Sequence, residues 1–100
     1  MSCATFEYLF KMCRRCRRAG RGNVMCAAAC INIEAFALRS GEVEVTREVL
    51  SKLAGFDISE EVFDAVAQDL RGRRVLVTAL AAQAASVFCR ELAKILAGLS

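Results

Sequence analysis

The sequence contains no histidine, no proline and no tryptophan among its 100 residues. The absence of histidine removes the commonest general base, the usual proton shuttle and every zinc site that mixes cysteine with histidine. The sequence also lacks a P-loop, a GxGxxG fingerprint and the glycine-flanked serine of a nucleophile elbow. We therefore expect a protein that is not an enzyme and has no catalytic residues.

Residues that break helices are scarce, since the chain has only six glycines and lacks proline. Alanine, leucine and charged helix formers dominate, which favours helix. An apolar content of 56% is enough to build a core. The sequence predicts an all-α protein: one domain over residues 1–100, folded as a compact bundle of about five helices.

Long apolar runs are absent as well. The longest uncharged runs lie over residues 23–33 and 75–89, and both are shorter than the roughly 18 to 20 residues that cross a bilayer. The N-terminus MSCATFEYLFKMC has charges inside its apolar stretch, unlike a signal peptide. We therefore expect no conventional membrane span and a cytoplasmic location.

Apolar periodicity places the first helix over about residues 3–18 and the second over about residues 23–39. The second helix is apolar on nearly all sides, so it should be the most buried. Its Glu34 is either a buried acid or the ion-pair partner of Arg39 or of a neighbouring helix. The following loop, RSGEVEV, could include a short extended piece at Val43 and Val45.

Capping signals define the remaining helices. Thr46 and Gly55 bound a short third helix, and Ser59 caps a fourth helix that stops at Gly72. The apolar pattern of the last segment predicts a fifth helix over about residues 74–99.

Four of the six cysteines lie in one stretch, KMCRRCRRAGRGNVMCAAAC. In an antiparallel helical hairpin, the residue numbers of two residues that face each other add up to a nearly constant value. Two pairs of cysteines meet this condition: Cys13 with Cys30, and Cys16 with Cys26. The spacing therefore predicts that these cysteines link the first two helices at two levels, about one helical turn apart.

Three chemistries fit these four cysteines. Disulfides Cys13–Cys30 and Cys16–Cys26 are the pairing that we expect, and the first would stabilise the fold by about 3 kcal/mol in the chain-entropy model. The same four thiolates could instead bind zinc or an iron–sulfur cluster. The third alternative is reduced thiols that pack as small apolar side chains. We expect no resident cofactor unless the metal alternative holds.

Cys3 and Cys89 lie near opposite ends of the chain. They could form a third disulfide if the last helix runs beside the first, and otherwise they are surplus or intermolecular thiols. Disulfides rarely persist in a reducing cytosol, with hyperthermophiles as an exception. Arginine outnumbers lysine eleven to three, which is compatible with such a source. We therefore expect a heat-stable protein of archaeal or viral origin.

Arginines form two clusters, RRCRRAGRG and RGRR, at expected helix ends where side chains can reach phosphates. If both turns lie at the same end of the bundle, the arginines form one face that binds nucleic acid without sequence preference. The alternative is solvated helix ends. Stacking platforms look poor, because Tyr8 is the only tyrosine. The expected nucleic-acid-binding residues are Arg14, Arg15, Arg17, Arg18, Arg21, Arg71, Arg73 and Arg74.

Charge is distributed in blocks, with a net charge of about +5 over residues 1–30, −6 over 31–70 and +4 over 71–100. The leading hypothesis is a small basic protein that binds nucleic acid or an acidic protein surface, and that forms a homo-oligomer. An alternative is a self-assembling subunit of a filament, pilus or capsid, packed through its alanine-rich helices, which would place it in a virion or outside the cell. A third is a four-cysteine metal or iron–sulfur module.

The stretch SGEVEVTREVLSKLAGFDISEEVFDAVAQDL, residues 40–70, resembles the N-terminal helices of archaeal acidic ribosomal stalk proteins. The resemblance lies in a short capped helix, an AG turn and a second capped helix after a loop rich in glycine and glutamate. It covers under a third of the chain, and the family's alanine-rich hinge and acidic tail are missing. It therefore assigns no role to any residue.

Overall fold

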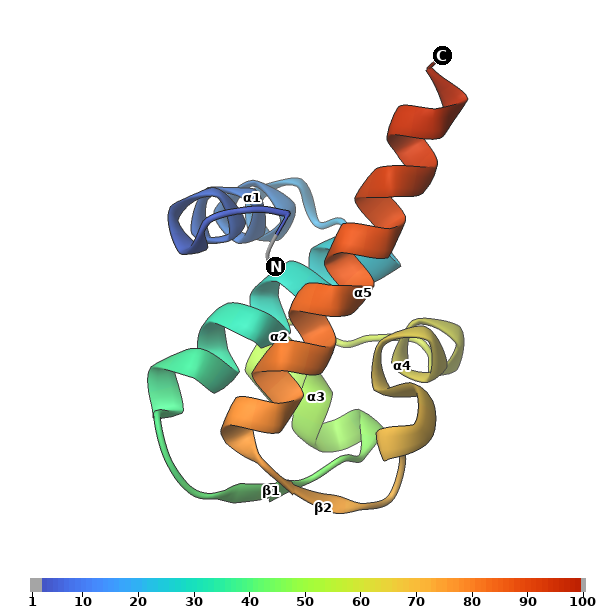
Figure 1. Cartoon of the computed structure of the whole chain (residues 1–100). Coiled ribbons are helices and arrows are strands. Elements are labelled where there is room, and N and C mark those ends of the chain that lie inside the picture. The colour runs from blue at the N-terminus through green and yellow to red at the C-terminus, as the bar shows by residue number, and fades with distance from the viewer. Residues whose placement is uncertain (1–2, 100) are drawn as a thin grey trace.

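The computed structural model describes residues 3–99 and confirms the all-α fold. Five helices follow one another along the chain: α1 (Phe6–Ala19), α2 (Val24–Leu38), α3 (Arg47–Ala54), α4 (Glu60–Ala67) and α5 (Val77–Gly98). A 3-10 turn, η1 (Gln68–Leu70), follows α4, and two short strands, β1 (Glu42–Glu44) and β2 (Arg74–Leu76), pair at one end of the bundle (Figure 1).

Side-chain caps fix the start of the first four helices. The predicted caps Thr46 and Ser59 are confirmed, because each accepts a hydrogen bond from a backbone N–H in the first turn of its helix. Asn23 caps α2 through the same kind of bond. Thr5 caps α1 in the same way, so α1 begins three residues later than predicted. At the other end of α1, Gly20 adopts a left-handed conformation with φ of 66°.

Helix α2 is the centre of the bundle, as its apolar sequence predicts. Its residues Ala27, Ala28 and Ala29 are completely buried, and the helix contacts α1, α3, α4 and α5, the last most extensively. The buried Asn32 is satisfied because its Nδ2 donates to the carbonyl oxygen of Ala81 on α5 at 2.8 Å. Small side chains thus let α2 and α5 pack closely against each other.

The predicted start of the fifth helix at residue 74 is wrong. Residues 74–76 form β2, which pairs antiparallel with β1 so that Val75 faces Val43 and Arg74 faces Glu44. The fifth helix, α5, therefore begins at Val77. The pairing extends past both strands. The Val45 N–H donates to the Arg73 carbonyl oxygen, and the Val45 carbonyl oxygen accepts from the Gly72 N–H. The extended piece expected near Val43 is present in β1.

The fourth helix also ends earlier than predicted. α4 stops at Ala67, where Gln68 takes a positive φ of 51°, and η1 then leads to the strand. After this break the chain reverses at Gly72, which takes a positive φ of 72° in a turn where the Arg73 N–H donates to the Leu70 carbonyl oxygen. The reversal places β2 against β1.

Three disulfides involve all six cysteines, which all lie within residues 3–99. The bridges Cys13–Cys30 and Cys16–Cys26 join α1 to α2 at two levels, so the cysteine-linked hairpin is confirmed. A third bridge joins Cys3, ahead of α1, to Cys89 on α5. α1 is thus covalently attached to the bundle near its beginning and along its second half.

The last part of α5 extends beyond the other helices (Figure 1). It exposes Ile95, Leu96 and Leu99, with 51%, 57% and 79% of each residue accessible. Within residues 3–99, no helix combines the length and the apolar character that crossing a membrane requires.

Candidate functional site

The two arginine clusters lie at different ends of the molecule. The first is on α1 and the turn after it, whereas Arg71, Arg73 and Arg74 lie around β2, at the opposite end of the bundle (Figure 1). The condition for one continuous arginine face is therefore not met. Each cluster has to be judged by its own contacts.

A basic stripe runs along the outer face of α1. Lys11, Arg14, Arg15 and Arg18 follow the helical spacing i, i+3, i+4, i+7 and together line a shallow surface depression of about 160 Å³. No ion pair involves Arg14, Arg15 or Arg18 within residues 3–99. Lys11 is paired with Glu7 at 3.2 Å, but both side chains are well exposed, so this pair binds weakly.

Lys11 was not among the predicted site residues, which were all arginines. Its spacing from Arg14, Arg15 and Arg18 was the signal that placed it on the same face. The apolar side of the same helix is buried through Leu9, Cys13 and Cys16. Because the buried and the basic residues lie on different sides of α1, the basic stripe faces away from the core.

Arg17 is separate from the basic stripe. Its Nε and Nη2 donate to the carbonyl oxygen of Ala54 at 3.0 and 2.8 Å, at the C-terminal end of α3. Gly55 makes this contact possible, because a Cβ there would lie 2.8 Å from the Arg17 Nε. Arg17 therefore caps α3 and ties it to α1, which is a structural role.

Glu34 is not the buried acid that its apolar surroundings predicted. Its side chain is 42% exposed, and its Oε1 lies 3.7 Å from the Nη2 of Arg17. The apolar side of α2 faces the core. Glu34 lies at the surface of α2 where α1 approaches it, so the Glu34 carboxylate can reach both water and the guanidinium of Arg17. The ion pair adds little beyond the carbonyl contacts of Arg17.

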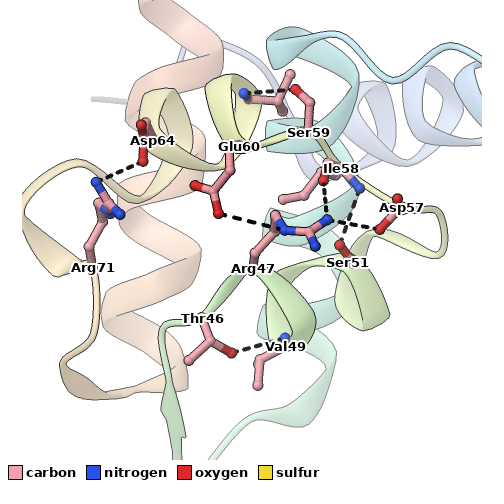
Figure 2. Close-up of polar contacts among 11 residues, drawn as sticks. Thr46, Arg47, Val49, Ser51, Asp57, Ile58, Ser59, Glu60, Asp64 and Arg71 are labelled. Carbon is pink, nitrogen blue, oxygen red and sulfur yellow. Dashed lines mark hydrogen bonds and ion pairs between the residues drawn. The ribbon is translucent and has the colours of Figure 1, made fainter.

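The second cluster is neutralised in part, because one of its three arginines has an acidic partner. Figure 2 shows Arg71 bonded to Asp64, with a distance of 2.9 Å from Nη1 to Oδ1, and the same guanidinium lies 5.5 Å from the ring centre of Phe63. Arg73, just before β2, and Arg74, at its start, are exposed, and Arg74 faces Glu44 in the register of the two strands. This part of the surface therefore offers phosphates less free positive charge than α1 does.

The acidic segment of α3 and α4 is also partly neutralised within the fold. Arg47 contacts Asp57 at 3.2 Å and Glu60 at 3.7 Å and donates to the carbonyl oxygen of Ile58 at 3.0 Å (Figure 2). Ser51 on α3 accepts a hydrogen bond from the N–H of Ile58, which lies in the loop between α3 and α4. These contacts fix the connection between α3 and α4, so they are structural.

An exposed aromatic cluster adjoins the basic stripe. Phe6 and Phe10 on α1 have ring centres 6.4 Å apart, and Phe36 at the end of α2 lies 5.5 Å from Phe6. All three are 44% to 59% exposed. The guanidinium of Arg14 lies 5.8 Å from the Phe10 ring centre, so the cluster and the stripe form one continuous surface.

The sequence prediction of poor stacking platforms did not anticipate this cluster. Phe36 is 30 positions beyond Phe6 in the chain and meets it only because the α1–α2 hairpin folds back. Phe6 and Phe10 lie on the same helix as the buried residues Leu9, Cys13 and Cys16, but both rings are exposed. The three rings contact one another and so form an apolar patch, whereas exposed apolar side chains that occur singly are normal.

Arg21 lies beyond the end of α1, on the rim of a groove that it shares with Arg15. Its backbone N–H donates to the carbonyl oxygen of Cys16 at 3.0 Å, which completes the helix end at Gly20. The structure thus brings Arg14, Arg15, Arg18 and Arg21 to one end of the bundle.

No protein-family model, no curated protein and no solved structure matches this chain.

Proposed function

We propose that this protein binds single-stranded nucleic acid through the basic stripe of α1 and the aromatic cluster beside it. The observation that supports the proposal most directly is the position of Arg14. It belongs to the stripe and also lies over Phe10, so phosphate-binding cations and exposed rings occupy one surface. Surfaces that bind single strands without sequence preference combine these two kinds of group.

The stripe suits a phosphate backbone because of its geometry. Residues three and four apart on a helix have Cβ atoms about 5–6 Å apart, so Arg14 and Arg18 offer a regular row of guanidinium groups. Guanidinium binds phosphate through parallel N–H bonds in a fixed planar arrangement. Because these side chains have no acidic partner within residues 3–99, their charge is available to a ligand.

The aromatic cluster favours unpaired bases over a duplex. Phe6, Phe10 and Phe36 are 44% to 59% exposed, and a flipped-out or unpaired base can cover a ring and remove its apolar surface from water. A duplex hides its base faces and would contact only the stripe. The proposed ligand is therefore a single strand, and the proposed role is binding without catalysis.

Replacing Phe36 with alanine is expected to weaken binding of a labelled single strand by roughly tenfold, because one base loses its stacking partner. Fluorescence anisotropy at low salt measures the affinity, and a duplex of the same length, measured in parallel, should change by less than about twofold. Leu38→Ala is the matched control, since Leu38 is equally exposed at the same end of α2 but outside the cluster.

The proposal of a stacking surface fails if Phe36→Ala and Leu38→Ala have the same effect, or if the duplex loses as much affinity as the single strand. A surface that prefers the duplex in the unmodified protein would also contradict it. Circular dichroism of both variants checks that the helices are intact.

A further inference from the structure

An apolar groove lies on the side of the molecule where α1 ends, α2 begins and α5 extends beyond the bundle (Figure 1). It encloses about 540 Å³, a size typical of pockets that hold small organic ligands. Most of its wall is apolar, and the buried Cys16–Cys26 disulfide also lines it. The apolar side chains are Met12, Ala19, Met25, Leu92 and Ile95.

The groove has cations at its rim and no acids in its wall. Arg15 and Arg21 line it, and both are exposed. Neither forms an ion pair within the described part of the chain, and none of the described residues that line the groove is acidic. An apolar trough with two free guanidinium groups is complementary to a molecule with an apolar tail and a negatively charged head.

We infer that the groove binds a single-chain amphiphilic anion of the fatty-acid type. Its acyl chain would lie along Met12, Met25 and Leu92, which are half-buried and hold the tail away from water. Its carboxylate would accept hydrogen bonds from Arg15 and Arg21 at the rim. Methionine suits this wall, because its unbranched thioether side chain adapts to a flexible tail.

This site is separate from the nucleic-acid surface, although Arg15 belongs to both. The groove depends on Ile95 and Met25, which are outside the basic stripe, whereas Arg14 and Arg18 line the stripe and not the groove. Variants at these positions therefore distinguish the two activities. Failure of one proposal would leave the other standing.

The test uses the full oxidised chain and a dansyl-labelled fatty acid below its micelle concentration. We expect saturable binding at one site per chain, and competition by saturated fatty acids that becomes roughly two- to fourfold stronger with each added methylene until the groove is filled. A fatty alcohol of the same length should bind more weakly than the acid. In a variant with Arg15→Gln and Arg21→Gln, the acid should lose its advantage over the alcohol.

Ile95→Glu should reduce binding of the labelled fatty acid by roughly tenfold or more, because it places a carboxylate against the acyl chain. Leu99→Glu is the matched control: it makes the same change one residue beyond the end of the same helix, outside the groove lining, and should leave binding unchanged. Both positions are at least half exposed, so neither change disturbs the core.

Several results would each overturn the inference. They are no binding of the monomeric fatty acid, affinity independent of chain length, equal losses in Ile95→Glu and Leu99→Glu, and binding to anionic vesicles without binding to the free acid. Sedimentation that shows a stable dimer unable to bind the probe would also overturn it, since a second copy would then fill the groove.

Discussion

Replacing Arg14, Arg15 and Arg18 together with glutamate is expected to weaken binding of a single strand by roughly 100-fold or more at low salt. Each replacement changes the local charge by two units, so the three positions go from +3 to −3. Anisotropy with a labelled oligonucleotide measures the loss. All three side chains are exposed and make no ion pair in the region the structure describes, so the fold should be unaffected.

A control with the same total charge separates local contact from general attraction. Changing Lys52, Arg73 and Arg74 to glutamate alters the net charge equally, but these exposed residues lie on α3 and around β2, outside the basic stripe. We expect this variant to keep most of its affinity, because long-range attraction is screened over about 8–10 Å in ordinary buffer. Equal losses in the two triple variants would contradict a binding site on α1.

Removing the Cys3–Cys89 bridge, by changing both cysteines to serine, is expected to cost about 4 to 5 kcal/mol in free energy of unfolding. This bridge closes the longest loop, with a sequence separation of 86, compared with 17 for Cys13–Cys30 and 10 for Cys16–Cys26. In the chain-entropy model the loss from unfolded-state constraint grows with loop length. Chemical denaturation of the oxidised protein and its variants measures the three contributions.

The corresponding fall in Tm should be roughly 15–35 °C for a domain of this size. Adding reductant to the unmodified protein should have a still larger effect, because all three bridges are then lost, and it should destabilise the Cys3→Ser/Cys89→Ser variant further. The account is contradicted if the variant retains the stability of the unmodified protein, or if reductant leaves the melting curve unchanged. A mass measured without reductant confirms that the remaining bridges are intact.

Much of the fold follows from local sequence signals. The residue numbers of the cysteines add up to nearly the same value in each of the two pairs between α1 and α2. This predicts the α1–α2 hairpin, because antiparallel helices keep a constant register across their interface. The caps Thr46 and Ser59 follow from hydroxyl side chains placed just before a helical pattern. These features depend on residues within a few positions of one another, or on one simple geometric rule, so a single sequence is enough to reveal them.

Features that depend on distant contacts were not predicted. Residues 74–76 have no strong local preference against helix, and they become a strand because β1 supplies a partner from 30 to 34 positions away. Arg17 could not be distinguished from Arg18 by sequence, since only the approach of α3 gives it the Ala54 carbonyl. The same holds for Phe36, whose partner Phe6 is brought near by the hairpin.

The candidate site was therefore predicted in part. Arg14, Arg15 and Arg18 lie together on α1, whereas Arg17 contacts α3 instead, and Lys11 was not included although its spacing was visible. The position of the second arginine cluster depends on the path of β2 across the bundle, which no local pattern specifies. The expected face of eight arginines consequently separates into a free basic stripe on α1 and a second cluster in which Arg71 is paired.

The salt dependence of single-strand affinity tests the central claim most directly. If the four cations of the basic stripe each contact one phosphate, log Kobs should fall against log salt concentration with a slope of roughly −2 to −3, because each contact contributes about −0.7 for a single strand. Changing Arg14 and Arg18 to glutamine should bring the slope closer to zero by about 1.4. A slope near zero, or one that these two changes leave untouched, would contradict a phosphate-binding surface on α1.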